Sequence, residues 1–286
     1  MKFVCYRDGG KELLGLVEDD MVRALDGYRG DLVGLIEQFD SLKFSLQPKG
    51  EPIPITELEL LAPIPQPRRN IFCVGKNYQE HAREFAGSGY EAGAKKGAEI
   101  DEFPAVFTKP ASTIIASGKE VDLHADITAS VDYEIELSLI IGKRGKNIAI
   151  ERAYEHIWGY TIINDVTARD RQKQHKQWFL GKSLDTFCPM GPWAVTADEI
   201  EPENLDLETR VNGEMRQSAN TRDLIFSIPS LIATISAGLT LMPGDIIATG
   251  TPAGVGIGFN PPKFLLSGDV VEMSITGLGT LTNTFR

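Results

Sequence analysis

The chain has 286 residues, of which 42% are hydrophobic and 24% charged, so it is long enough to bury a substantial core. Its formal net charge is −11, and its densest basic cluster is the short run KRGK at residues 143–146, which argues against nucleic-acid binding. The longest apolar runs fall far short of the ~20 residues that span a bilayer, and charge and glycine appear too early in the chain for a signal peptide. These features predict a cytoplasmic protein with no membrane partner.

The first 64 residues are expected to form a small N-terminal α/β domain. Turn sequences divide residues 1–27 into three short strands, and DLVGLIEQF, which begins at Asp31, reads as a short amphipathic helix. Six prolines then fall within residues 47–69, a composition typical of a linker or an extended strap. We place a domain boundary near residue 64, which leaves residues 65–286 as a second, larger domain.

The second domain begins with a predicted strand, NIFCVG, and a predicted helix, KNYQEHAREFA. The segment 86–103 is rich in glycine and charge and is predicted to be a mobile loop or lid. Further along, VDYEIELSLIIG (131–142) is predicted to be one long strand, residues 150–160 a helix, and YTIINDVTARD a strand that leaves into a polar loop.

From residue 191 the chain is predicted to form mainly short strands, including a hairpin with Asn212 and Gly213 at its turn. A helix, IPSLIATISAGL, ends at a glycine. Strands dominate, without the regular strand–helix alternation of a doubly wound sheet. We therefore expect an α+β, mainly β fold with a roll or barrel-like core. The widely spaced cysteines, Cys5, Cys73 and Cys188, form no CxxC pair and are expected to be buried free thiols.

The strongest local feature is the pair Glu134 and Glu136 in VDYEIEL. Residues two apart in a strand share a face, so two carboxylates would project together from an apolar strand. Their repulsion would be relieved by a hard cation such as Mg²⁺ or Mn²⁺ with oxygen ligands. Asp165, at the end of the next apolar strand, would complete a three-carboxylate set. The alternatives are a solvated strand face for the glutamates and a turn or N-cap role for Asp165.

Further polar residues offer acid–base and anion-binding chemistry. His81 and Glu84 lie three apart and would share a helix face, where the carboxylate orients the imidazole; a surface pair is the alternative. Arg169 with Gln172 offers donors for a carboxylate, and Lys182 offers a compact positive charge for a developing enolate, unless all three belong to a charged surface loop.

The run ATGTPAGVGIG (248–258) is rich in glycine but is not a dinucleotide fingerprint, because Phe259 stands where the last glycine would be required. Its backbone N–H groups and the Thr251 hydroxyl offer a site for an anion, and a simple turn is the alternative.

Several of these blocks occur in a fixed order: VGKNYQEHAREF, FTKPAST, VDYEIELSLIIGK, GYTIINDVTARDRQ, WFLGKSLDTFCPMGP, RVNGEMRQ and MPGDIIATGTPAGVG. Together, over roughly residues 65–286, they closely resemble the fumarylacetoacetate hydrolase superfamily. The wording of KQWFLGKSLDTFCPMGP and PPKFLLSGD is most similar to the fumarylacetoacetate hydrolase domain-containing branch, rather than to the true tyrosine-degradation enzyme.

The resemblance implies a small N-terminal domain followed by a β-roll catalytic domain, usually in a homodimer. It implies Mg²⁺ or Mn²⁺ held by three carboxylates, those of Glu134, Glu136 and Asp165. It implies a catalytic group of three side chains: His81, Glu84 and Lys182. It also implies that substrate oxygens are held by Arg169, Gln172 and Thr251.

The function that the resemblance implies is a metal-dependent hydrolase that cleaves a C–C bond in a small 2,4-dioxo acid, such as fumarylpyruvate or maleylpyruvate, through an enolate. The alternatives are an oxaloacetate decarboxylase or tautomerase, or an isomerase or hydratase of a related dienoic 2-oxo acid. All use a small anionic 2-oxo acid as substrate. A non-enzymatic binding protein is disfavoured, because it need not keep the catalytic and metal residues together.

Overall fold

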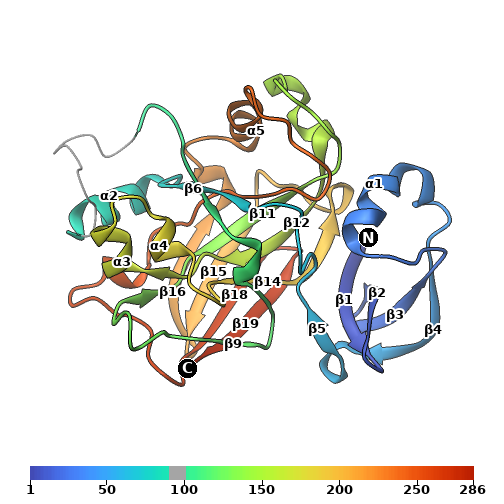
Figure 1. Cartoon of the computed structure of the whole chain (residues 1–286), viewed down its shortest axis with the longest axis horizontal. Coiled ribbons are helices and arrows are strands. Elements are labelled where there is room, and N and C mark those ends of the chain that lie inside the picture. Colours follow the sequence, from blue (N-terminus) through green and yellow to red (C-terminus); the bar gives the residue numbers. More distant parts are fainter. Residues whose placement is uncertain (90–100) are drawn as a thin grey trace.

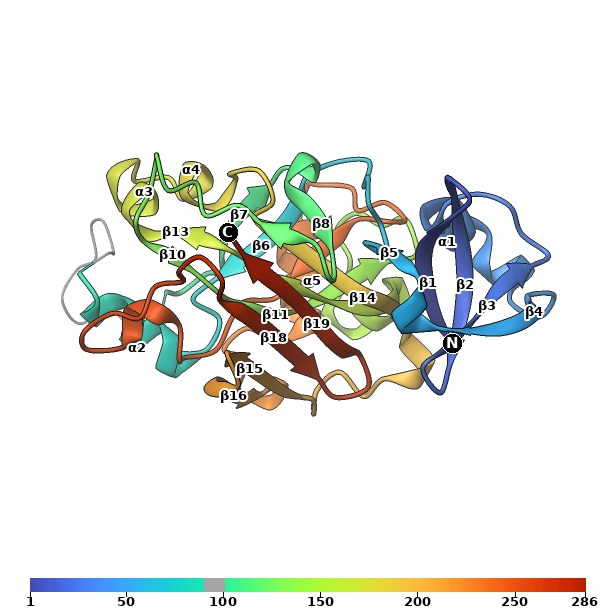
Figure 2. The ribbon, with the colours of Figure 1, turned by 90° about the horizontal axis from the view of Figure 1, so that it is seen from below.

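The computed structural model describes residues 1–89 and 101–286. Most of this structure is β-sheet, in a twelve-stranded sheet, a five-stranded sheet and a small two-stranded ladder. The large sheet has the order β4-β3-β2-β1-β14-β12-β11-β17-β6-β7, with β5 beside β1 and β8 beside β14. Figures 1 and 2 show the N-terminal strands at one end of the molecule and the helices α2, α3 and α4 at the other. The expected α+β, mainly β fold is confirmed.

The N-terminal segment forms the outer part of the large sheet. Its elements are β1 (Lys2–Asp8), β2 (Lys11–Glu18), β3 (Met21–Asp26), α1 (Leu32–Leu42), β4 (Gln47–Pro54) and β5 (Glu59–Leu61). The three predicted strands and the helix are confirmed, and the Asp31 side chain caps the helix by accepting a hydrogen bond from the Gly34 N–H. The predicted strap is partly wrong, because residues 47–54 pair with β3. Proline is tolerated there because β4 is the edge strand.

The central strands of the large sheet carry the buried core. They are β6 (Ile71–Gly75), β7 (Ala105–Lys109), β8 (Ile114–Ala116), β11 (Ile135–Ile141), β12 (Ile157–Asn164), β14 (Cys188–Thr196) and β17 (Ile246–Ala248). Every residue of β11, β12 and β14 is buried, as expected for strands that are covered on both faces. The three cysteines are buried free thiols, as predicted. Because β1 pairs directly with β14, the sheet continues from the N-terminal strands into this core, and a domain boundary near residue 64 remains a prediction.

The five-stranded sheet packs against the first. It contains β9 (Glu120–Val121), β15 (Asp206–Val211), β16 (Glu214–Asn220), β18 (Val270–Ile275) and β19 (Gly279–Phe285). The predicted β15–β16 hairpin is confirmed, and Asn212 and Gly213 both have positive φ, as a tight two-residue turn requires. Alternating burial along β18 shows that one face of this sheet is buried and the other is only partly covered.

The helices outside the N-terminal segment are short. They are α2 (Gln79–Gly87), α3 (Arg169–Gln174), α4 (Phe179–Lys182) and α5 (Ile228–Ser236). Single 3₁₀ turns occur at Ile55–Glu57, Ala111–Thr113, Ala197–Glu199, Thr221–Asp223 and Gly256–Gly258. Among the described residues, no helix combines the length and apolar character that a membrane crossing requires.

Three predictions need correction or fall outside the described chain. Residues 131–142 form two strands: β10 (Val131–Asp132) pairs with β13 (Thr167–Ala168), whereas β11 pairs with β12. The predicted helix at 150–160 is a 3₁₀ segment, Ile150–His156, because the apolar run after it is claimed by β12, which pairs with strands on both sides. Most of the predicted lid, residues 90–100, lies outside the described residues.

Candidate active site

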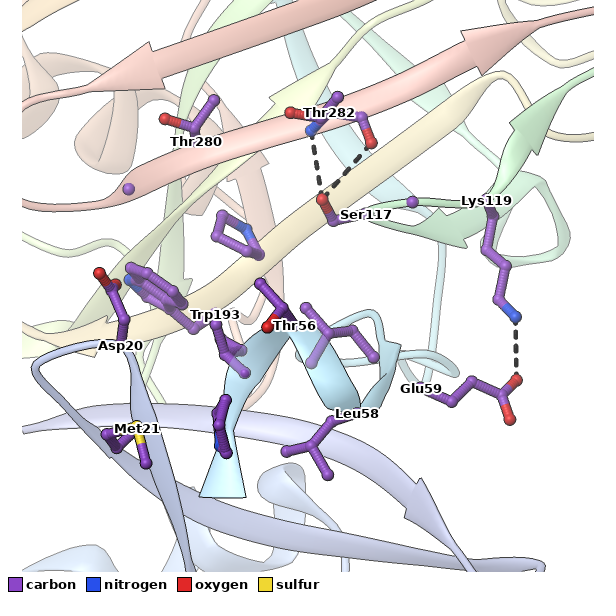
Figure 3. Close-up of a pocket in the computed structure, with 16 residues that line it drawn as sticks. Asp20, Met21, Thr56, Leu58, Glu59, Ser117, Lys119, Trp193, Thr280 and Thr282 are labelled. Carbon is purple, nitrogen blue, oxygen red and sulfur yellow. Dashed lines mark hydrogen bonds and ion pairs between the residues drawn. The ribbon is translucent and has the colours of Figure 1, made fainter. Parts of the chain in front are cut away.

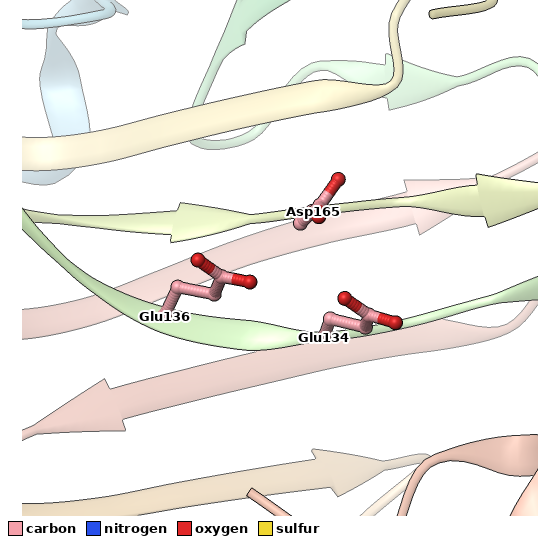
Figure 4. Close-up of side chains that lie close together, drawn as sticks. All are labelled: Glu134, Glu136 and Asp165. Carbon is pink, nitrogen blue, oxygen red and sulfur yellow. The ribbon is translucent and has the colours of Figure 1, made fainter. Parts of the chain in front are cut away.

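Three buried carboxylates meet where two neighbouring strands of the large sheet end. Glu134 lies in the gap between β10 and β11, Glu136 lies on β11, and Asp165 directly follows β12. Figure 4 shows the three side chains gathered between these two segments, and one oxygen from each lies within 4.8 Å of the others. The pairing of Ile135 with Asn164, and the hydrogen bond from the Asp165 N–H to the Glu134 carbonyl, fix this arrangement. The predicted three-carboxylate set is therefore present.

Buried cations neutralise two of the three carboxylates. Lys182 Nζ donates to Glu134 Oε2 and to Asp165 Oδ2, at 2.7 Å in both cases. Lys109 Nζ donates to Asp165 Oδ1 at 2.7 Å, and Arg169 Nη1 lies 2.7 Å from Glu134 Oε1. Sequence reasoning missed Lys109, whose only signal was its place in the block FTKPAST.

Glu136 differs from Glu134 in its charge environment. Burial favours the neutral acid in both, but in Glu134 the charges of Lys182 and Arg169 outweigh it and lower the pKa to about 2. In Glu136, burial and the nearby charges of Asp165 and Glu134 raise the pKa well above its usual value. Its carboxylate accepts a backbone hydrogen bond from Gly250 at 2.9 Å. An acidic set with one under-neutralised, fully buried member suits an oxygen-ligated divalent cation.

His81 and Glu84 form a pair on α2, as predicted. His81 Nδ1 lies 3.3 Å from Glu84 Oε2, and His81 is buried. The Gly254 N–H donates to both Glu84 oxygens, at 3.1 and 3.2 Å. A Cβ atom at Gly258 would overlap the Glu84 carboxylate, so a larger residue there would displace that carboxylate. The loop after β17 therefore holds Glu84 against His81.

The same loop binds a second carboxylate, that of Asp132. The Gly256 and Ile257 N–H groups donate to Asp132 at 2.6 and 3.1 Å, and Arg169 Nε donates to Asp132 Oδ2 at 2.9 Å. This glycine-rich run does offer N–H groups to anionic groups, as expected, and those groups are the protein's own Glu84 and Asp132 carboxylates. Sequence reasoning also missed Asp132, because the pattern that indicated a metal site in this segment involved only Glu134 and Glu136.

A narrow cavity of about 20 Å³ connects these groups. Its polar wall contains seven of the predicted site residues: His81, Glu134, Glu136, Arg169, Gln172, Lys182 and Thr251. Its apolar wall includes Trp178, whose ring packs edge-on against Phe107 and Phe85, with centroids 5.4 and 6.1 Å apart. A Cβ atom at Gly75 would overlap the Trp178 ring, so the indole lies directly on the backbone of β6. The predicted site residues Asp165 and Glu84 do not line the cavity, but each contacts a residue that does: Lys182 for Asp165 and His81 for Glu84.

A larger hollow, of about 790 Å³, lies between the N-terminal strands and β14. Figure 3 shows Trp193 and Leu58 in its wall and the Lys119–Glu59 ion pair, 2.9 Å long, at one side. In the described part of the chain, the carboxylates beside the narrow cavity are the group of side chains that suits a metal ion. The narrow cavity is therefore the candidate active site.

Comparison with known proteins defines the class. Residues 70–286 match the family model described as fumarylacetoacetate (FAA) hydrolase C-terminal, and residues 1–63 match Rv2993c-like, N-terminal. The chain belongs to the fumarylacetoacetate hydrolase family. It is 55% identical over 230 residues to oxaloacetate tautomerase YisK of Bacillus subtilis, covering 80% of this chain and 73% of that protein.

Solved structures resemble the whole chain. A fumarylacetoacetate hydrolase from Exiguobacterium antarcticum is 40% identical with a TM-score of 0.85, covering 100% of this chain and 99% of that one. Maleylpyruvate hydrolase from Sphingobium sp. SYK-6, in complex with manganese(II) and pyruvate, is 32% identical with a TM-score of 0.78, covering 100% and 98%. Similar proteins thus include a tautomerase and a hydrolase.

Proposed function

We propose that this chain is a metal-dependent tautomerase that interconverts the keto and enol forms of oxaloacetate. The observation that carries the proposal is the His81–Glu84 pair beside a narrow cavity that is lined by Glu134 and Glu136, two of the three clustered carboxylates. The similarity to oxaloacetate tautomerase YisK supports the choice of substrate. This similarity favours oxaloacetate tautomerisation, an alternative that the family resemblance implies, over hydrolysis of a 2,4-dioxo acid.

Glu134, Glu136 and Asp165 would hold Mg²⁺ or Mn²⁺. When bound, the cation would act as a Lewis acid toward the 2-oxo group of the substrate. Burial disfavours the Lys182 ammonium, but the charges of Asp165 and Glu134 outweigh this effect and raise its pKa, so the side chain stays cationic. Lys182 therefore supplies a fixed positive charge near the oxygen on which negative charge develops.

His81 would move the proton. A hydrogen bond from Nδ1–H to Glu84 leaves the lone pair on Nε2, which makes that nitrogen the base. Nε2 takes a proton from C3 of the keto form, and the C–H electron pair forms the C2–C3 double bond while the carbonyl π pair moves onto the 2-oxo oxygen. The imidazolium then returns the proton to that oxygen, which completes the enol with no net loss of atoms.

Arg169, Gln172 and Thr251 would hold the substrate carboxylates. Arg169 Nη2 is buried and has no hydrogen-bond partner among the described residues, although Nε and Nη1 of the same guanidinium are paired. A buried donor without a partner is costly, and a bound carboxylate would satisfy it. This orphaned donor supports an anionic ligand in the cavity.

The apolar wall favours a short substrate. Trp178 lies on Gly75 and packs against Phe85 and Phe107, so among the described residues this aromatic wall leaves little space beyond the polar groups of the cavity. A four-carbon diacid needs less space than an acylpyruvate with a long acyl group and an attacking water.

Hydrolysis of an acylpyruvate is the second candidate. It is supported by the similarity to maleylpyruvate hydrolase and by the same His81–Glu84 pair, which can activate water instead of moving a proton from carbon. A homodimer, implied by the family resemblance, is likewise kept as a proposal.

The test is a comparison of substrates with EDTA-stripped protein, with and without Mn²⁺ or Mg²⁺. Loss of the enol absorbance of freshly dissolved oxaloacetate is followed beside a metal-only blank, and cleavage of acetylpyruvate, fumarylpyruvate and maleylpyruvate is followed in parallel. We expect metal-dependent ketonisation well above the blank, and its loss in His81→Asn. Acylpyruvate cleavage faster than ketonisation would replace the tautomerase proposal with the hydrolase.

A further inference from the structure

The Gln217 side chain connects the carboxylate strand to the loop that follows β17. It lies on β16 and is fully buried. Its Oε1 accepts hydrogen bonds from the Ile135 N–H at 3.2 Å and from the Thr209 hydroxyl at 2.9 Å. Its Nε2 donates to Thr251 Oγ1 and to the Pro252 carbonyl, both at 2.8 Å. All four hydrogen-bonding positions of one amide are therefore used.

Two backbone groups fix which way this amide points. The Ile135 N–H can only donate, so the atom beside it must be Oε1. The Pro252 carbonyl can only accept, so the atom beside it must be Nε2. A flipped amide would oppose donor to donor and acceptor to acceptor in a fully buried site. The N–H that reaches Thr251 is thus determined by the backbone and not by the choice of rotamer.

This orientation determines how Thr251 can bond. Its hydroxyl oxygen accepts from Gln217, and this is the one hydrogen bond of its side chain among the described residues. Because a hydroxyl has a single proton, that proton is available for another acceptor. Thr251 lines the narrow cavity, next to the residue whose N–H donates to Glu136. Because Thr251 lines the cavity, we expect this acceptor to belong to a ligand bound there.

We propose that Gln217 is a positioning residue that presents the Thr251 hydroxyl as a hydrogen-bond donor to a carboxylate oxygen of a bound 2-oxo acid. Ile135, which anchors the other end of the amide, lies between Glu134 and Glu136. The same side chain therefore fixes the distance between the donor and the carboxylate strand. The inference rests on the proposed substrate class, but it holds equally for a tautomerase and a hydrolase.

The experiment is a double-mutant cycle on Mn²⁺-loaded protein, with pyruvate as the probe and its affinity measured by calorimetry. Thr251→Val removes the donor and keeps the shape. Gln217→Glu keeps the acceptor for Ile135 and Thr209, but its carboxylate accepts the Thr251 proton and so withdraws it from the ligand. Thr209→Val is the matched control, since it removes a hydrogen bond from the opposite end of the same amide. Thermal unfolding of every variant measures any structural effect separately.

We expect Thr251→Val and Gln217→Glu each to weaken pyruvate binding about tenfold, and the double variant to bind no more weakly than Thr251→Val alone. Thr209→Val should change stability and leave affinity unchanged. Unchanged affinity in Thr251→Val, or additive losses in the double variant, would overturn the inference, even if Gln217→Glu alone failed to fold. Failure of the proposed function would be seen separately: oxaloacetate would not be turned over, while pyruvate binding would still show the coupling between Gln217 and Thr251.

Discussion

Lys109 Nζ donates to Asp165 Oδ1 at 2.7 Å, and both side chains are completely buried. Lys109 also donates to the carbonyl oxygens of Val166 and Lys182. One ammonium group thus connects a candidate metal ligand to the turn after it and to the segment that carries Lys182. The other Asp165 oxygen accepts from Lys182, so this carboxylate is held from both sides.

Replacing Lys109 with methionine should destabilise the protein strongly. The change leaves the Asp165 carboxylate with one partner fewer in a buried site, and breaking a buried ion pair costs about 3–5 kcal/mol. Denaturant unfolding of the metal-free protein measures the loss. Lys119→Met is the control, because Lys119 pairs with Glu59 at the surface and its loss should leave the midpoint nearly unchanged. Equal effects of the two substitutions would contradict the role given to Lys109.

Glu136→Gln should abolish tight metal binding without unfolding the chain. The amide resembles the protonated acid that burial and the nearby Asp165 and Glu134 charges favour in the metal-free state. Loss of a charged ligand should weaken Mn²⁺ binding by more than the roughly 10- to 100-fold lost when a hydrogen-bond partner of a ligand is removed. Titration of the stripped protein with Mn²⁺, followed by electron paramagnetic resonance, gives the affinity. Binding as tight as in the wild type would exclude Glu136 as a ligand.

The same carboxyl group predicts the pH dependence of the metal-free protein. Because the folded-state pKa of Glu136 lies above the usual 4.5, its stabilising contribution is complete below that value. It is lost progressively as the pH rises from 4.5 toward the raised pKa. Thermal unfolding over this range should show a decline in the wild type that is smaller in Glu136→Gln. A decline of the same size in both proteins would assign it to other groups.

Gly75→Ala should disturb the candidate site through Trp178. The new methyl group would overlap the indole ring and push it away from β6, toward the space that the substrate needs. Displacement of a cavity wall by about 1 Å can cost up to roughly 10²-fold in rate, so kcat/KM for oxaloacetate should fall, and the tryptophan fluorescence should change. Gly87→Ala is the matched control, since a Cβ atom there meets no described residue within 4 Å. If both alanine variants behave alike, Trp178 does not shape the cavity.

Gly258→Ala should impair the proton transfer that we assign to His81. Its methyl group would displace the Glu84 carboxylate, which then no longer orients the imidazole. We expect kcat to fall roughly 10²-fold with little change in KM, because substrate is held by other groups. Glu84→Gln should produce a similar loss, and combining the two substitutions should add little to either one. Fully additive losses would show that Gly258 acts elsewhere.

The residue pattern and the family resemblance together anticipated most of the candidate site. The carboxylates were found because apolar residues surround them, and that context implies burial. Lys109 and Asp132 were not found, because each acts through a partner far along the chain: Asp165 is 56 residues from Lys109, and Gly256 is 124 residues from Asp132. No local pattern reports such pairings.

The errors in the predicted elements also have long-range causes. The run 131–142 reads as one strand, yet it divides at Glu134 because its two parts pair with different partners, β13 and β12. The segment 150–160 has helical composition, but its apolar end is drawn into the sheet between β11 and β14. In both cases sheet pairing overrode the local preference.

The pairing of β1 with β14 gives the N-terminal segment a protective role. Along its side away from β12, β14 is covered by β8 at Cys188–Met190 and by β1 at Ala194 and Val195. Removing residues 1–63 would therefore leave part of a fully buried, apolar strand with open backbone hydrogen-bonding groups, the arrangement that templates aggregation. A chain truncated to residues 64–286 is expected to precipitate for this reason, even with every candidate site residue intact. Activity measurements therefore need the N-terminal segment in place.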